Sequence, residues 1–119
     1  MSYDIGVTPM MGIAGSDLST KQFQAVSWNT SGQLAITADA AAADGILLNT
    51  PGSGQAGAVA TVPGQISRAK AGGAITAGDL LEVASGKLVT KSSGKVVAKA
   101  LAAATADGDI IPVLLMLDR

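Results

Sequence analysis

Short apolar segments separated by turn-forming residues make up most of this chain. Residues 23–28, "FQAVSW", alternate large apolar side chains with small or polar ones, as a half-buried strand does, and a cluster of turn formers follows at residues 29–32. The other segments with strand character are 33–37, 45–49, 58–62, 65–71, 79–84, 87–91, 95–102 and 109–117. Apolar segments of this length, separated by turns, predict an all-β fold built from short antiparallel strands.

Two of these segments have features of strands at the edge of a sheet. Polar side chains at Gln65, Ser67 and Lys70 interrupt the apolar pattern of the fifth segment, residues 65–71. Pro112 lies within the last segment and has no N–H to donate, which predicts an edge position or a bulge there. The alanine-rich stretches 38–45 and 101–108 are too short for stable helices, so we expect loops.

One pattern occurs twice in the sequence. Ser31-Gly32-Gln33-Leu34 matches Ser85-Gly86-Lys87-Leu88 at an offset of 54 residues, which places Val26 on Leu80 and Ile36 on Thr90. An alanine-rich stretch, an Asp-Gly pair and an apolar strand follow each hairpin. A duplicated hairpin-plus-strand unit and a chance match of common residues both explain this. In either case, we expect a small barrel or sandwich.

The composition excludes most catalytic and metal chemistry. The chain has no histidine and no cysteine, so the commonest general base, the commonest metal ligand and all thiolate chemistry are absent. The acidic pairs Asp107–Asp109 and Asp79–Glu82 suit hard cations such as calcium, but also ordinary turns in which aspartate accepts backbone N–H groups. A strand follows the glycine-rich loop 51–57, where a phosphate cradle needs a helix. We expect no enzyme, no catalytic residue, no metal and no cofactor.

The charge pattern limits the partners. Eight basic and nine acidic residues give a net charge of −1 and stand singly, without the basic stripe that nucleic acid requires. No apolar run approaches the length of a membrane span, and the N-terminus lacks a signal-peptide pattern. We expect neither nucleic acid nor membrane as a partner, and synthesis in the cytoplasm.

The first seventeen residues match neither the helical nor the strand period. They mix apolar side chains with glycines and a proline, which predicts an extended N-terminal arm over residues 1–17 and a single β domain over 18–119. Such an arm either lies on a partner or caps its own sheet. With Trp28, expected to be buried at the end of the first strand or against a neighbouring subunit, the candidate partner-binding residues are Tyr3, Ile5, Val7, Met10, Met11, Ile13 and Trp28.

The order of motifs resembles the small capsid cement, or decoration, proteins of tailed bacteriophages. The motifs cover roughly residues 15 to 117 and are Ala25-Val26, Gly45-Ile46-Leu47, Pro51 with Gly54, residues 64–69 and residues 75–80. The resemblance implies a non-enzymatic β protein that assembles, usually as a homotrimer, on the outer surface of an expanded phage head. There it would bind the major capsid protein and clamp neighbouring subunits.

Two alternatives to a cement protein remain at this stage. "ITAGDLL" at residues 75–81 also resembles the β-clip of sugar-acid and antifreeze-like domains, which suggests a module that binds carbohydrate or a host surface. Three aromatic residues, Tyr3, Phe23 and Trp28, are few for stacking on sugar rings. The other alternative is an enzyme that depends on the acidic residues.

Overall fold

All regular structure in the described part of the chain is β-strand. The computed structural model describes residues 9–119, which contain ten strands and no helix able to cross a bilayer. The strands are β1 (Pro9–Ile13), β2 (Ala25–Trp28), β3 (Leu34–Ile36), β4 (Gly45–Leu47), β5 (Ala56–Ala60), β6 (Ile66–Lys70), β7 (Leu80–Ala84), β8 (Lys87–Thr90), β9 (Ala98–Ala100) and β10 (Ile110–Leu115). The predicted all-β fold class is confirmed.

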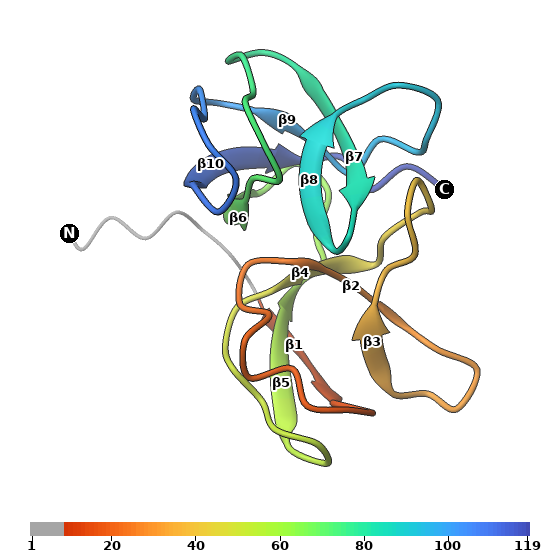
Figure 1. Ribbon diagram of the computed structural model, residues 1–119. Coiled ribbons are helices and arrows are strands. Elements are labelled where there is room, and N and C mark those ends of the chain that lie inside the picture. Colours follow the sequence, from red (N-terminus) through yellow and green to blue (C-terminus); the bar gives the residue numbers. More distant parts are fainter. Residues whose placement is uncertain (1–8) are drawn as a thin grey trace, which may run out of the picture.

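The ten strands form two five-stranded sheets with the same strand order. The first sheet has the order β1-β5-β4-β2-β3 and the second has the order β6-β10-β9-β7-β8, so each strand of the first matches the strand five places later. Figure 1 shows the first sheet in the lower lobe and the second in the upper lobe. The repeated unit is therefore a whole five-stranded sheet, larger than the hairpin plus strand seen in the sequence.

Each sheet curls until its two edge strands meet. A parallel bridge joins Ala14 to Leu34 in the first repeat, and an equivalent bridge joins Ala71 to Leu88 in the second. The glycine after each alanine donates its backbone N–H to the same leucine carbonyl, at 3.0 and 2.8 Å. Each repeat is thus a small barrel, closed at one point along the seam between its edge strands.

Strand registers align the two repeats residue by residue. Val26 pairs with Ile36 and Gly45, and Leu81 pairs with Thr90 and Ala98, so Val26 corresponds to Leu81. The constant offset of 54, which places Val26 on Leu80, is therefore wrong for this strand. The first hairpin has one more residue in its turn than the second, and this shifts the alignment.

The barrel interiors correspond in the same way. Six buried residues form the core of the first barrel: Ala14, Leu18, Val26, Leu34, Leu47 and Val59. Their equivalents all belong to the second core cluster, and are Ala71, Ile75, Leu81, Leu88, Ala100 and Val113. The two repeats therefore bury the same positions with side chains of similar kind.

The first strand of the fold lies within the segment that the sequence pattern assigned to an arm. Residues 9–13 pair along their length with β5, and Ala14 is buried in the first core. These residues belong to the first barrel, so of the two arrangements predicted for an arm they adopt the one on the chain's own sheet. The alternation is hidden because Gly12 takes an inward position, where a methyl group would lie 2.8 Å from Leu34 Cγ.

Pro112 lies in the part of β10 that has a neighbouring strand on one side only, so part of this segment takes an edge position, as predicted. β10 pairs with β6 over residues 110–114 and with β9 from Val113 onward. Pro112 stands opposite the point where β9 ends, and its carbonyl accepts the N–H of Leu101 at 3.0 Å. The missing proline donor therefore interrupts no ladder. β6 ends its sheet, as the polar pattern predicts.

Candidate assembly surface

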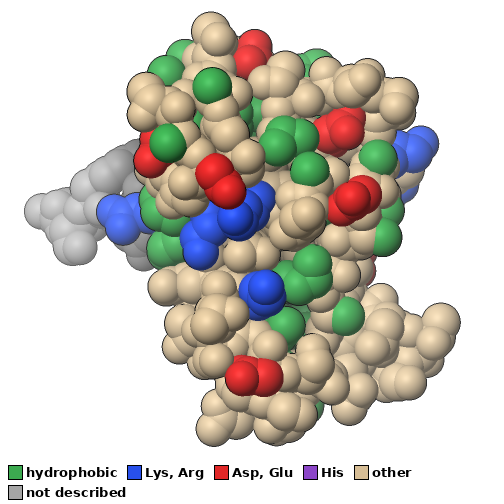
Figure 2. Space-filling model, viewed as in Figure 1, with side chains coloured by type: hydrophobic (Ala, Val, Ile, Leu, Met, Phe, Trp, Pro, Cys, Tyr) green, Lys and Arg blue, Asp and Glu red, His purple; other side chains and the backbone are tan. Residues whose placement is uncertain are grey.

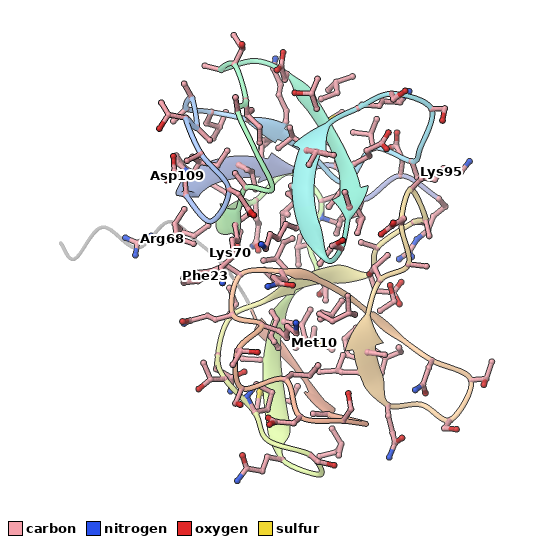
Figure 3. The ribbon with its side chains drawn as sticks, in the orientation of Figure 1. Met10, Phe23, Arg68, Lys70, Lys95 and Asp109 are labelled. Atoms are coloured by element: carbon pink, nitrogen blue, oxygen red, sulfur yellow. The ribbon has the colours of Figure 1, made fainter. Side chains whose placement is uncertain are left out.

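The two barrels are joined by backbone hydrogen bonds at the junction between the lobes. Lys70 donates its N–H to the carbonyl of Phe23 at 2.8 Å, and Ala25 donates to the carbonyl of Gly86 at 2.8 Å. Phe23 has a positive φ of 66°, and its equivalent in the second repeat is Gly78, with φ of 94°. Figure 3 shows Phe23 next to Lys70 at this junction. Phe23 keeps a conformation that favours glycine while both of its backbone groups are bonded, its N–H to the carbonyl of Leu47 in the first barrel at 2.7 Å and its carbonyl to Lys70 across the junction.

The junction also buries the part of the outer face of the first sheet that β2, β4 and β5 form. Ala25, Ile46 and Ala60 have no exposed surface, and they pack in the same cluster as the core of the second barrel. Their strand neighbours, such as Val26 and Leu47, point into the first barrel instead. Both faces of β2 and β4 are therefore covered, and the apolar core runs from one repeat into the other.

The outward face of β1 is apolar and open. Met11 and Ile13 are 61% and 46% exposed, on the opposite side of the strand from inward-facing Gly12. At the equivalent positions β6 carries Arg68 and Lys70. Because the same fold accepts charged side chains there, the apolar pair is not needed for folding. This makes β1 a candidate contact surface.

The candidate partner-binding residues lie in different places. Met10 is on the same side of β1 as Gly12 and is 54% exposed. Met10, Met11 and Ile13 are therefore three exposed apolar side chains of one edge strand, which we call the edge of β1. Trp28 ends β2 as predicted, is half-buried and packs against the first core, with its Nε1 above Gly12. Tyr3, Ile5 and Val7 lie outside the described residues.

A second apolar surface, on the outer face of the second sheet, is absent from the sequence predictions. Leu80, Leu101 and Ile110 are 41%, 43% and 44% exposed there. An adjoining hollow of about 470 Å³ is lined by Ile66, Ser67, Arg68, Ile110, Ile111 and Pro112. In the sequence these leucines and isoleucines stand next to core residues such as Leu81, and an unbroken apolar run does not reveal which face remains open.

The acidic side chains serve mainly as acceptors for backbone N–H groups. Asp109 Oδ2 accepts the N–H groups of Thr105 at 2.9 Å and Ala106 at 3.1 Å, and these bonds hold the pKa of Asp109 below its ordinary value of 3.8. Glu82 accepts the N–H groups of Ser92 and Gly94 in the same way, and its pKa is lowered as well. Across residues 9–119 no group of three or more acids could hold a metal ion.

The charged groups on the visible face do not merge into a continuous stripe. Lys87 forms an ion pair with Asp107 at 2.8 Å, and Arg119 pairs with Asp44. Figure 2 shows a few basic side chains gathered close to the junction, with an acidic side chain beside them and neutral surface around them. The described surface is therefore better suited to apolar and backbone contacts than to a highly charged ligand.

Comparison with known proteins shows the fold. No family model matches the sequence, and no curated protein matches it significantly. Among solved structures, the N base of head fiber gp8.5 of bacteriophage phi29 superposes with a TM-score of 0.76 at 17% sequence identity, covering 95% of this chain and 97% of that one. The two chains share a fold. The shared fold takes in both repeats, because the superposition spans nearly the whole of each chain.

Proposed function

We propose that this chain is a structural protein of a bacteriophage virion that binds the head and catalyses no reaction. The observation that carries the proposal is the shared fold with the base of a phage head fiber, over 95% of one chain and 97% of the other. The order of motifs in the sequence supports the same class of protein independently. A surface whose exposed features are apolar strand edges suits a protein that functions through contact.

The finer proposal is a decoration, or cement, protein on the outer capsid surface. The chain binds the major capsid protein of an expanded head, assembles as a homotrimer and clamps neighbouring capsid subunits. The edge of β1, with Met10, Met11 and Ile13 exposed, provides the contact with the head. Because many copies bind the same symmetric shell, modest affinities at single sites are enough for strong attachment overall.

Binding to purified heads tests the proposal directly. The chain is mixed at rising concentration with expanded, DNA-free heads of the phage that encodes it, and the bound fraction is measured by cosedimentation. Unexpanded procapsids of the same phage serve as the control. We expect saturable binding to expanded heads and weaker binding to procapsids. Binding that does not saturate, or no binding to either particle, excludes the decoration role.

A double variant of β1 tests the contact surface. Met11→Arg with Ile13→Lys installs the side-chain types that β6 carries at the same positions, so the barrel has a precedent for tolerating them. We expect head binding to weaken at least tenfold, or about 1.4 kcal/mol per site. Val62→Lys, at a position 38% exposed outside β1, is the matched control. If the double variant binds like the control, β1 does not contact the head.

A further inference from the structure

The two repeats pack head to tail, so each contributes a different surface to the junction. The first repeat contributes the outer face of β2, β4 and β5, where Ala25, Ile46 and Ala60 are fully buried. The second repeat contributes the turn of its β7–β8 hairpin, at Ser85 and Gly86. In Figure 1, β2 and β4 lie at the junction, whereas β9, the equivalent of β4, lies on the far side of the upper lobe.

The contact at the junction is close. The carbonyl of Gly86 accepts the N–H of Ala25 at 2.8 Å, and the N–H of Ser85 donates to Asp39 Oδ1 at 2.8 Å. A methyl group at Gly86 would lie 2.9 Å from Ile36 Cγ2. Glycine is therefore needed at the tip of this hairpin, both for this approach and for its φ of 80°.

The second repeat leaves the equivalent face open. Leu80 corresponds to Ala25, Lys99 to Ile46 and Leu114 to Ala60. Leu80 is 41% exposed, Lys99 is exposed and Leu114 is half-buried, whereas their three counterparts have no exposed surface. Leu101 is 43% exposed, whereas its counterpart Leu48 is half-buried and packs against the core at the junction.

The first repeat likewise leaves its hairpin turn open. Ser31 and Gly32 correspond to Ser85 and Gly86 and are both exposed. Gly32 has a φ of 74°, close to the 80° of Gly86, so the two glycines share a backbone conformation. The serines before them differ, because Ser85 has a positive φ of 51° and Ser31 does not have a positive φ. The chain therefore carries an unused copy of each half of an interface that it forms within itself.

We propose that the open face of the second sheet receives the β2–β3 turn of a second copy of this chain. Gly32 of one copy then lies over Leu80 of the next, as Gly86 lies over Ala25 within one chain. The interface is heterologous, and such interfaces close into rings when the rotation between subunits permits. A closed ring of three copies agrees with the homotrimer of the proposed function. This inference rests on the proposed function only for the number of copies.

Leucine in place of alanine gives the open face more apolar surface than the covered one. Leu80 and Leu114 stand where the junction has Ala25 and Ala60, and Lys99 replaces the buried isoleucine with a side chain that keeps its charge in water.

Sedimentation velocity of the full chain, without heads, tests the proposal. From about 1 µM to about 100 µM we expect the wild-type mass to rise above that of the monomer. Leu80→Glu should raise the dissociation constant at least about tenfold. The fold should tolerate this change because residue 80 faces Lys99 across the β7–β9 pair, where a glutamate adds an ion pair. Val62→Glu is the matched control.

The outcomes separate this proposal from the proposed function. The head-to-tail interface is overturned if the wild-type chain stays monomeric, or if Leu80→Glu and Val62→Glu form equally stable oligomers. Saturable binding to heads would still support the decoration role in that case. If heads are not bound but the oligomer forms and Leu80→Glu disrupts it, the interface stands and the decoration role falls.

Cysteine pairing identifies the two contacting surfaces and covers the case of a variant that fails to fold. The natural chain has no cysteine, so Ser31→Cys and Leu80→Cys, both at exposed positions, each introduce a single thiol. Under mild oxidation we expect disulfide-linked dimers when the two variants are mixed, and few with either alone. The proposal is overturned if Leu80→Cys alone crosslinks as much as the mixture, because that indicates a symmetric contact. It is also overturned if the mixture does not crosslink.

Discussion

At the scale of single residues, the two repeats show which side chains the fold requires. In the turn before β5, the N–H of Gly52 donates to Gln55 Oε1 at 2.7 Å, and in the turn before β10 the N–H of Ala106 donates to Asp109 Oδ2 at 3.1 Å. One acceptor is a neutral amide and the other is a carboxylate. The turn therefore needs an oxygen at this position but not a charge.

This difference predicts that the turn before β10 depends on pH and that the equivalent turn before β5 does not. The folded pKa of Asp109 is below its ordinary 3.8, so its stabilising effect is complete above the unfolded pKa and is lost as the pH falls through the folded one. Glu82, with an ordinary value of 4.5, behaves in the same way. We expect the melting temperature to fall below about pH 4.5, and to fall less steeply in Asp109→Asn, which keeps an acceptor oxygen.

The melting temperature of each variant is measured by circular dichroism between pH 7 and pH 2. Asp118→Asn, at an exposed carboxylate, serves as the control. Equal slopes for Asp109→Asn and the wild type would show that Asp109 contributes nothing to acid unfolding.

At the scale of elements, the equivalent strands β4 and β9 differ in whether a side chain fits at their first residue. Gly45 of β4 faces Val26 across the pair with β2, where the second repeat has Ala98 facing Leu81. A methyl group at Gly45 would lie 2.3 Å from the carbonyl oxygen of Ala60. A side chain is thus accommodated in β9 but not in β4, although the two strands hold the same place in their sheets.

Gly45→Ala should therefore push β4 away from β5 and lower the free energy of unfolding by about 1–3 kcal/mol. Gly73→Ala is the matched control, because a methyl group at Gly73 meets nothing within 4 Å. Urea denaturation of the two variants measures the difference. Equal stability of both would mean that the β4–β5 pair yields to the added methyl group without cost.

At the scale of the whole molecule, the shared core predicts that the two barrels unfold together. The interior of one barrel contains six buried residues, which is a small core even for a domain of about 60 residues. The outer face of the first sheet, at Ala25, Ile46 and Ala60, extends the core of the second repeat across the junction. The core of the second barrel therefore includes the junction, and the core of the first barrel that is separate from it contains six residues.

Differential scanning calorimetry of the full chain should accordingly show a single transition, with the van't Hoff enthalpy equal to the calorimetric enthalpy. Measurement at low concentration keeps self-association out of the comparison. Two resolved transitions, or a van't Hoff enthalpy near half the calorimetric one, would show that the barrels unfold independently.

Local sequence patterns were sufficient to predict the fold class and most of the strands. Residues 79–84 and 87–91 predict the β7–β8 hairpin because the alternation of side chains and the turn at Ser85-Gly86 are local properties of the chain. The polar pattern of residues 65–71 predicts the edge position of β6 for the same reason. Met10, Met11 and Ile13 were selected as apolar residues outside any regular pattern, and they lie exposed on β1.

Which surfaces are covered was decided by the tertiary structure alone. β1 joins β5 and Pro112 stands opposite the end of β9, and both facts depend on a neighbour that is distant in sequence. Ala25 and Leu80 hold equivalent places in equivalent strands, yet one is buried and the other open because only the first sheet has a second barrel packed on it. Alternation along a strand separates its two faces, but what lies against each face is determined by contacts between distant parts of the chain.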